Sequence, residues 1–273
     1  MEITLLRATA LIYLLATIAA LAGIALRGET PRRLLLGLVG FGLGIHVVSI
    51  AVRAMLVGAL PAGSFAEGLS LLAAILVALF LALQLRAPLL ALGTVVMPIA
   101  FGLVLTASVT KGGAEPLPPM LRSAWLPVHV ALALLGDAVF AIACSASTLY
   151  LVQERRLKTH RGRGMRRRLP SLETLDRVAH SCLVWGLILL TLGIVTGIVW
   201  AHQAWGARSW ISDPKLVFSL VVWALYVILL QGRMTAGWRG RRAAQLTIAG
   251  FAVLVISLVG VNVLSLGQHA GAY

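Results

Sequence analysis

Charged residues are scarce in this chain of 273 residues, and acidic residues are scarcer still. Only 12% of the residues are charged, nine of them Asp or Glu, whereas 60% are hydrophobic. An ordinary soluble domain carries about 25% charged residues, and a soluble protein of this size could not cover its surface with so few. The composition therefore excludes a soluble globular enzyme and a disordered chain, and it predicts an all-α integral membrane protein.

Cysteine is nearly absent as well. The two cysteines, Cys144 and Cys182, lie in separate apolar runs with neither a metal-binding spacing nor a disulfide pattern. We therefore expect both to be packing residues. The sequence also contains no hydrolytic triad and no nucleotide-binding loop. It predicts no catalytic residues, and at most a subunit of a larger enzyme complex.

Eight apolar runs are long enough to cross a bilayer, which takes roughly 20 residues as a helix. They span residues 4–26, 34–56, 67–86, 88–110, 124–152, 179–202, 215–232 and 243–267. The third and fourth runs are separated only by Arg86, Ala87 and Pro88, where proline favours a tight turn. The sequence predicts one integral membrane domain over residues 1–273, a polytopic bundle of eight transmembrane helices in the lipid bilayer.

Basic residues are distributed unevenly between the two ends of this predicted bundle. Of the 23 Lys and Arg, 17 fall on one side, nine of them in the loop 153–178. Because cytoplasmic loops are enriched in Lys and Arg, both termini are expected outside the cytoplasm. The expected location is a bacterial inner membrane. The loop itself is best explained as a topology determinant, with anionic lipid or RNA as the alternatives. Its lack of aromatic residues argues against a nucleic-acid partner.

Three of the six histidines fall at the predicted outer face, on three different helices. They are His129, His202 and His269. Imidazole is a strong ligand for haem iron and for zinc or copper. The alternative is that these side chains bond to lipid headgroups or to backbone. His160 and His180 lie toward the cytoplasm, and His46 lies near the middle of its helix.

Tryptophans and cations at the same outer face favour haem over a bare metal ion. Clustered indoles form a flat apolar wall suited to a porphyrin, and guanidinium or ammonium groups pair with propionates. Zinc and copper sites usually add carboxylate or thiolate ligands, and only Asp213 is close in sequence. Trp125 also falls at this face, and the residues expected to form the haem platform and its propionate contacts are Trp200, Trp205, Trp210, Asp213, Arg122, Arg208 and Lys215.

Several ordered motifs resemble one family of membrane proteins. Gly197-Ile-Val-Trp-Ala-His-Gln-Ala-Trp-Gly206, Asp213-Pro-Lys215 and Trp223-Ala-Leu-Tyr226 resemble the tryptophan-rich outer segment of the cytochrome c assembly proteins, the CcsA, CcmC and HemX-like group. Pro127-Val-His129 with Tyr150-Leu-Val-Gln-Glu154 resembles the fifth helix of that family. Gly237-Trp-Arg-Gly-Arg-Arg-Ala-Ala244 and Gly260-Val-Asn262, followed by His269, resemble its C-terminal helix.

The resemblance implies a function and a ligand set. In that family a histidine before the tryptophan segment and one after it are the external axial haem ligands, which carries over to His129 and His269. The segment from Trp200 to Asp213 would be the platform for a non-covalent, b-type haem. The haem would be delivered to apocytochrome c or to a haem carrier, and any ligation activity would need a membrane partner with a large external domain.

The chain also departs from the family pattern. Ala207-Arg-Ser-Trp-Ile-Ser212 holds fewer tryptophans than the full motif, Leu216 replaces an acid, and Gln231 stands where many members have a histidine. These departures leave a second hypothesis open, a HemX-like regulator of haem synthesis that acts through cytoplasmic partners.

Three further residues have two interpretations each. His46 is either an internal haem ligand or a hydrogen-bonding partner of a neighbouring helix. Asp137 either lines a polar path or orients a ligand, or else it bonds to a serine or backbone carbonyl. Glu67 either lines the outer vestibule or caps a helix N-terminus.

Overall fold

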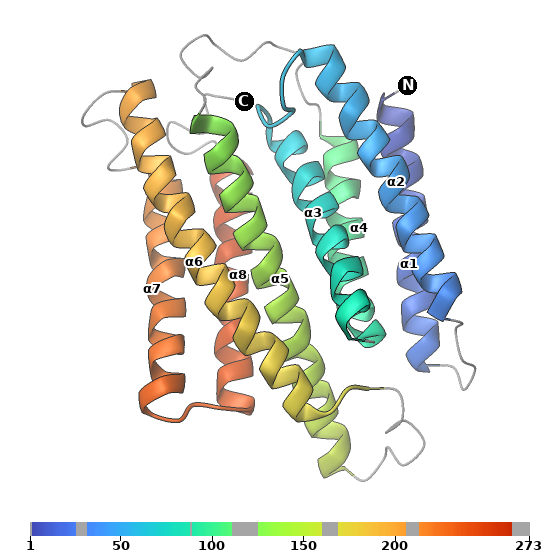
Figure 1. Cartoon of the computed structure of the whole chain (residues 1–273), viewed down its shortest axis with the longest axis vertical. Coiled ribbons are helices and arrows are strands. Elements are labelled where there is room, and N and C mark those ends of the chain that lie inside the picture. The colour runs from blue at the N-terminus through green and yellow to red at the C-terminus, as the bar shows by residue number, and fades with distance from the viewer. Residues whose placement is uncertain are drawn as a thin grey trace.

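The computed structural model describes residues 2–25, 32–87, 89–110, 125–159, 169–205 and 213–263, and it is helical almost throughout (Figure 1). Eight of the described helices are long and apolar enough to cross a membrane, which confirms the predicted all-helical bundle. They are α1 (Glu2–Ala25), α2 (Arg32–Val57), α3 (Phe65–Arg86), α4 (Gly93–Val109, after the short 3-10 helix η1, Leu90–Leu92), α5 (Trp125–Lys158), α6 (Leu172–Trp205), α7 (Pro214–Thr235) and α8 (Arg241–Val263).

Large apolar side chains cover the outside of the bundle. Leu11, Phe41 and Ile228 are each more than half exposed. A soluble protein would leave few such side chains in water, whereas a lipid environment accepts them. The helical form follows from the same environment, because a helix satisfies its own backbone hydrogen bonds where no water is present. The chain is a multi-pass membrane protein.

The helices form two groups, α1–α4 and α5–α8, which lie beside each other in Figure 1. Tyr13, Leu76 and Phe80 are fully buried in the first group, whereas the rings of Phe140 and Tyr226 stack 4.1 Å apart in the second. Helix α5 joins the groups, because it packs against α3 as well as against α6 and α8. The two cysteines carry no disulfide, and Cys144 is buried among packing side chains.

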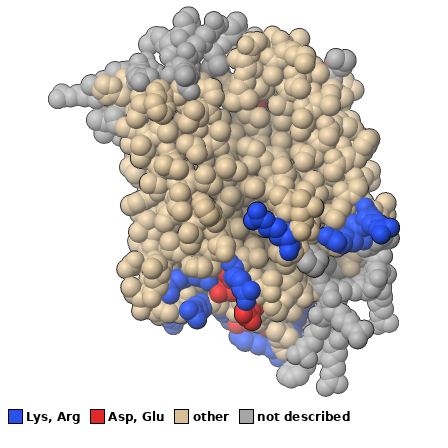
Figure 2. Space-filling model, in the orientation of Figure 1, with Lys and Arg blue, Asp and Glu red and all other residues tan. Residues whose placement is uncertain are grey.

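Exposed basic residues gather at one end of the bundle, the lower end in Figure 2. This basic end holds Arg32, Arg33, Arg86, Arg155, Lys158, Arg177, Arg239, Arg241 and Arg242. The described chain starts at Glu2 and stops at Val263, both at the opposite end, here called the pocket end (Figure 1). The uneven charge expected from the sequence is therefore present in the folded chain.

Some predicted boundaries are wrong. The predicted loop 153–178 is helical at both of its ends, because α5 continues to Lys158 and α6 begins at Leu172. Polar residues there extend both helices beyond the apolar span, supported by the (i, i+4) ion pairs Lys158–Glu154 and Arg177–Glu173. The predicted external segment 200–214 is likewise helical up to Trp205 and again from Pro214.

Candidate functional site

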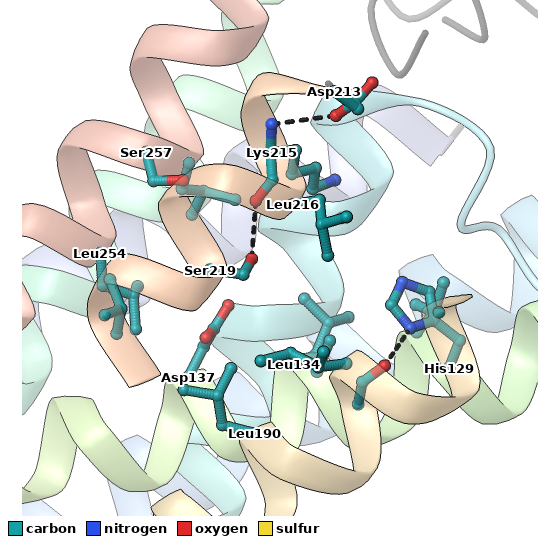
Figure 3. Close-up of a pocket in the computed structure, with 18 of the residues that line it drawn as sticks. His129, Leu134, Asp137, Leu190, Asp213, Lys215, Leu216, Ser219, Leu254 and Ser257 are labelled. Atoms are coloured by element: carbon teal, nitrogen blue, oxygen red, sulfur yellow. Dashed lines mark hydrogen bonds between the residues drawn. The ribbon is translucent and has the colours of Figure 1, made fainter. Parts of the chain in front are cut away.

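A cavity of about 180 Å³ opens between the two helix groups at the pocket end (Figure 3). Helices α3, α5, α6, α7 and α8 all contribute to its wall, and most of the lining is apolar. We call it the membrane pocket. Its polar lining residues are Ser64, His129, Asp137, Asp213, Lys215, Ser219 and Ser257. An apolar wall that carries a small number of polar groups is the usual composition of a binding site for an organic ligand.

His129 lies in the first turns of α5, in the pocket wall. Its Nδ1 is 2.9 Å from the backbone carbonyl oxygen of Gly193 on α6. A carbonyl can only accept a hydrogen bond, so Nδ1 carries the proton and donates it, which fixes both the tautomer and the orientation of the ring. Metal-ligating histidines are held in this way, with the other nitrogen, Nε2, facing the metal.

Trp200 and Gly197 on α6 pack against the imidazole of His129. The indole of Trp200 is buried and stacks on the imidazole, with ring centroids 6.2 Å apart and planes only 8° apart. Gly197 leaves space for the imidazole, since a Cβ atom at that position would lie 2.7 Å from His129 Cε1. At Gly193, by contrast, a Cβ atom would lie 3.5 Å from the Ala133 backbone nitrogen, which is an ordinary van der Waals contact. The close contact on this face of α6 is therefore at Gly197.

The Gly197 position makes a testable prediction. Gly197→Ala should force the His129 ring out of place and lower the free energy of unfolding by about 1–3 kcal/mol, as overpacking does. The measurement is the thermal unfolding midpoint in detergent, followed by tryptophan fluorescence. Gly102→Ala on α4 is the control, because nothing lies within 4 Å of its Cβ position and alanine is the better helix former. Equal midpoints for the two variants would contradict the proposed contact.

The start of α7 places a cation at the mouth of the pocket. Asp213 is only 2% exposed and caps α7, since its Oδ1 accepts a hydrogen bond of 2.9 Å from the Lys215 backbone N–H. Pro214 occupies the first turn, where its missing N–H costs nothing. The Asp-Pro-Lys sequence therefore begins the helix and holds Lys215 in the pocket lining. Asp213 acts here as a cap.

Asp137 lies two turns further along α5 and lines the same pocket (Figure 3). Neither the serine nor the backbone carbonyl considered from the sequence is its partner: no hydrogen bond joins its carboxyl to another of the described residues. The Ser219 hydroxyl, across the cavity, instead donates to the Lys215 carbonyl oxygen at 2.8 Å. Ser219 and Ser257 were not anticipated, because isolated serines in apolar runs give no sequence signal.

Other expected site residues are placed only in part. His202 is exposed near the end of α6, outside the pocket lining, and Trp125 is exposed at the start of α5. Trp205 belongs to α6, and its side chain is not among those that the structure describes. Arg122, Arg208, Trp210 and His269 lie outside the described residues, and their roles remain predictions.

His46 belongs to a separate, buried network between α1, α2 and α3. Its Nε2 lies 2.9 Å from Ser70 Oγ, and its Nδ1 lies 3.3 Å from the Tyr13 hydroxyl. The ring is fully buried and does not line the membrane pocket. Of the two interpretations given by the sequence, bonding to neighbouring helices is the one that the structure supports. On α2 the glycine that packs closely is Gly42, where a Cβ atom would lie 2.9 Å from Tyr13 Cε1.

Glu67 caps α3, as one of its two interpretations predicts. Ser64 and Glu67 form a reciprocal capping box, and Glu67 also accepts a hydrogen bond of 2.7 Å from Arg53 Nε. Arg53 reaches Glu2 as well, at 3.5 Å. These contacts fix the start of α3, whose residues Phe65 and Gly68 form part of the pocket wall.

Comparison with known proteins identifies related sequences. A family model described as "Cytochrome C assembly protein" matches residues 35–269. That range includes every helix that lines the membrane pocket, together with both histidines expected to bind haem.

Individual relatives are similar at about one third identity. The chain is 33% identical over 178 residues to the cytochrome c biogenesis protein CcsA of Synechococcus sp. (strain CC9605), covering 58% of each chain. It is 33% identical over 198 residues to the protein of that name from Guillardia theta, covering 66% of this chain and 65% of the relative. The chain therefore matches somewhat less than two thirds of the length of these relatives.

Proposed function

The chain belongs to the cytochrome c assembly protein family, and from that premise we propose that it holds haem in the membrane pocket and delivers it to apocytochrome c or to a haem carrier. The haem is cargo, bound non-covalently. The proposal names His129 and His269 as its axial ligands and Trp200 as part of its platform.

The observation that carries the proposal is the setting of His129. Its Nδ1 proton is donated to Gly193, its ring is stacked on a buried tryptophan, and it stands in an apolar pocket with Lys215 at the mouth. A porphyrin needs an imidazole for iron, apolar contact for its faces and cations for its propionates. The residues present fit all three needs.

A bare metal ion fits this site less well. No group of three or more His, Cys, Asp or Glu side chains that could hold a metal ion occurs among the described residues. Zinc and copper sites normally require such a set. An ion with only one imidazole from the described residues would also leave the apolar wall of the pocket without a function.

The orientation in the membrane decides which compartment receives the haem. We propose that the basic end faces the cytoplasm of a bacterial inner membrane, following the enrichment of basic residues on that side. The membrane pocket then opens at the outer face, where c-type cytochromes acquire their haem. Since the described connections are short, a partner with a large external domain would present the apocytochrome.

The test is a titration of the purified protein in detergent with haemin. We expect saturable binding of one haemin per chain and a Soret band of the bis-histidine type. Haemin dimethyl ester, which lacks the propionate charges, should bind at least about tenfold more weakly, because its esters cannot pair with Lys215. Absence of a saturable signal, or equal binding of the ester, would contradict the proposed site.

A further inference from the structure

The turn between α7 and α8 carries three exposed arginines within four residues. Arg239 lies in the turn itself, and Arg241 and Arg242 are the first two residues of α8. We call these three residues the turn arginines. They belong to the basic end, on the opposite side of the bundle from the membrane pocket (Figure 1). Three like charges so close together repel one another, so the cluster favours the binding of an anion.

Among the described residues, no carboxylate forms an ion pair with the turn arginines. The described acids of the basic end are each paired with another cation: Glu154 with Lys158, Glu173 with Arg177 and Asp176 with Arg233. The last of these pairs joins α6 to α7 at 2.8 Å, and the Arg233 side chain is buried. The turn arginines, by contrast, are exposed and available to an anion from outside the chain.

The backbone that carries the turn arginines is held in place by its neighbours. Gly237 and Gly240 have φ angles of 64° and 65°, which glycine adopts without steric cost. The backbone N–H of Trp238 donates a hydrogen bond of 3.0 Å to the Gly232 carbonyl oxygen, and its indole packs against Gly232. A Cβ atom at Gly240 would lie 2.8 Å from the Tyr150 hydroxyl, so the turn lies directly against α5. A site arranged in advance loses less entropy when it binds a ligand.

The surface next to the turn arginines is apolar. Leu246 lies one turn along α8 from Arg242, on the same face of the helix, and is 42% exposed. Met234, in the last turns of α7, is 75% exposed. Cations at the end of a membrane helix with apolar side chains beside them match a ligand that is anionic at one end and apolar beyond it. A phospholipid of the surrounding bilayer has this form.

We propose that the α7–α8 turn is a binding site for an anionic phospholipid, and that cardiolipin fills it best because one molecule carries two phosphates. Guanidinium groups bind phosphate oxygens in bidentate fashion. The acyl chains would lie along the apolar side chains of α7 and α8. Since both helices line the membrane pocket at their other ends, a lipid held at the turn would stabilise the pair of helices on which the pocket depends. The proposal does not require that the chain binds haem.

The test is a titration of the purified, delipidated protein in detergent with cardiolipin or phosphatidylcholine, in which native mass spectrometry counts the bound lipids. We expect saturable binding of one cardiolipin per chain, at least about tenfold tighter than phosphatidylcholine. Glutamine at all three turn arginines should weaken cardiolipin binding about tenfold or more. Lysine at all three should weaken it only about threefold, because the charge remains and the bidentate geometry is lost. Each single glutamine variant should cost about threefold, which keeps the test available if the triple variant does not fold.

The matched control removes the same number of charges from elsewhere on the basic end. Arg33, Arg86 and Arg155 are exposed there, and replacing all three with glutamine should change cardiolipin affinity less than about threefold. Equal weakening by the two triple variants would show a general positive field and overturn the proposed site, as would equal binding of the two lipids. Inorganic phosphate should not displace cardiolipin, because it lacks acyl chains. Displacement would assign the turn to a free phosphate and overturn the assignment to a lipid.

Discussion

Replacing both His129 and His269 with alanine should remove the bis-histidine Soret band from the purified, haemin-treated protein. The two imidazoles belong to distant parts of the sequence, because His129 lies at the start of α5 and His269 follows α8. The double variant would therefore remove both proposed axial ligands of the iron. Alanine at both positions leaves the porphyrin only apolar contact and propionate pairing. Apolar contact and propionate pairing do not involve the iron and are open to any amphiphilic molecule. The bis-histidine spectrum should therefore disappear even if some porphyrin stays in the detergent.

Replacing only one of the two histidines should remove only one of the two axial ligands. His129→Ala should convert the spectrum to that of a five-coordinate haem, because one axial ligand remains. His160→Ala is the matched control, since this histidine follows α5 in the sequence and belongs to none of the motifs that resemble the haem-binding segments, and its spectrum should equal that of the unmodified protein. A bis-histidine spectrum that survives in the double variant would reject the ligand assignment. In that case two of the four remaining histidines, His46, His160, His180 and His202, would have to bind the iron.

The number and type of the helices could be predicted from the apolar runs in the sequence. Apolar runs of about 20 residues have few alternatives in a bilayer, because the backbone must satisfy its own hydrogen bonds. The ends could not be placed so well. Helix α6 begins at Leu172, seven residues before the apolar run, since polar helical turns outside the membrane give no hydropathy signal.

The sequence could predict which types of residue form the site, but it could predict their arrangement in space less well. The proximity of His129 and Trp200 follows from the pairing of α5 with α6. The acceptor for His129, the Gly193 carbonyl, is invisible in a sequence because every residue has one. The same limit applies to Asp137, because the sequence placed it at membrane depth but could not say whether it faced lipid, a partner or a cavity.

His46 shows that residue type alone can suggest a ligand that its neighbours do not support. A histidine at the middle of a membrane helix is consistent with a haem ligand, and only its neighbours distinguish the alternatives. Ser70 and Tyr13 bond to its two ring nitrogens and lie 24 and 33 residues away in the sequence. No local pattern links these three residues. Their meeting depends on how α1, α2 and α3 pack.

The most direct test of haem delivery measures covalent and non-covalent haem in cells that lack this protein. Haem attached to c-type cytochromes should fall to background, whereas b-type haem and 5-aminolaevulinate should stay near normal, because in the proposed orientation the pocket opens at the outer face and can serve only steps after haem has crossed the membrane. The unmodified gene should restore c-type haem, and the His129→Ala, His269→Ala form should not. A parallel change in all haems, fully corrected by that double variant, would contradict delivery and favour a regulator of haem synthesis.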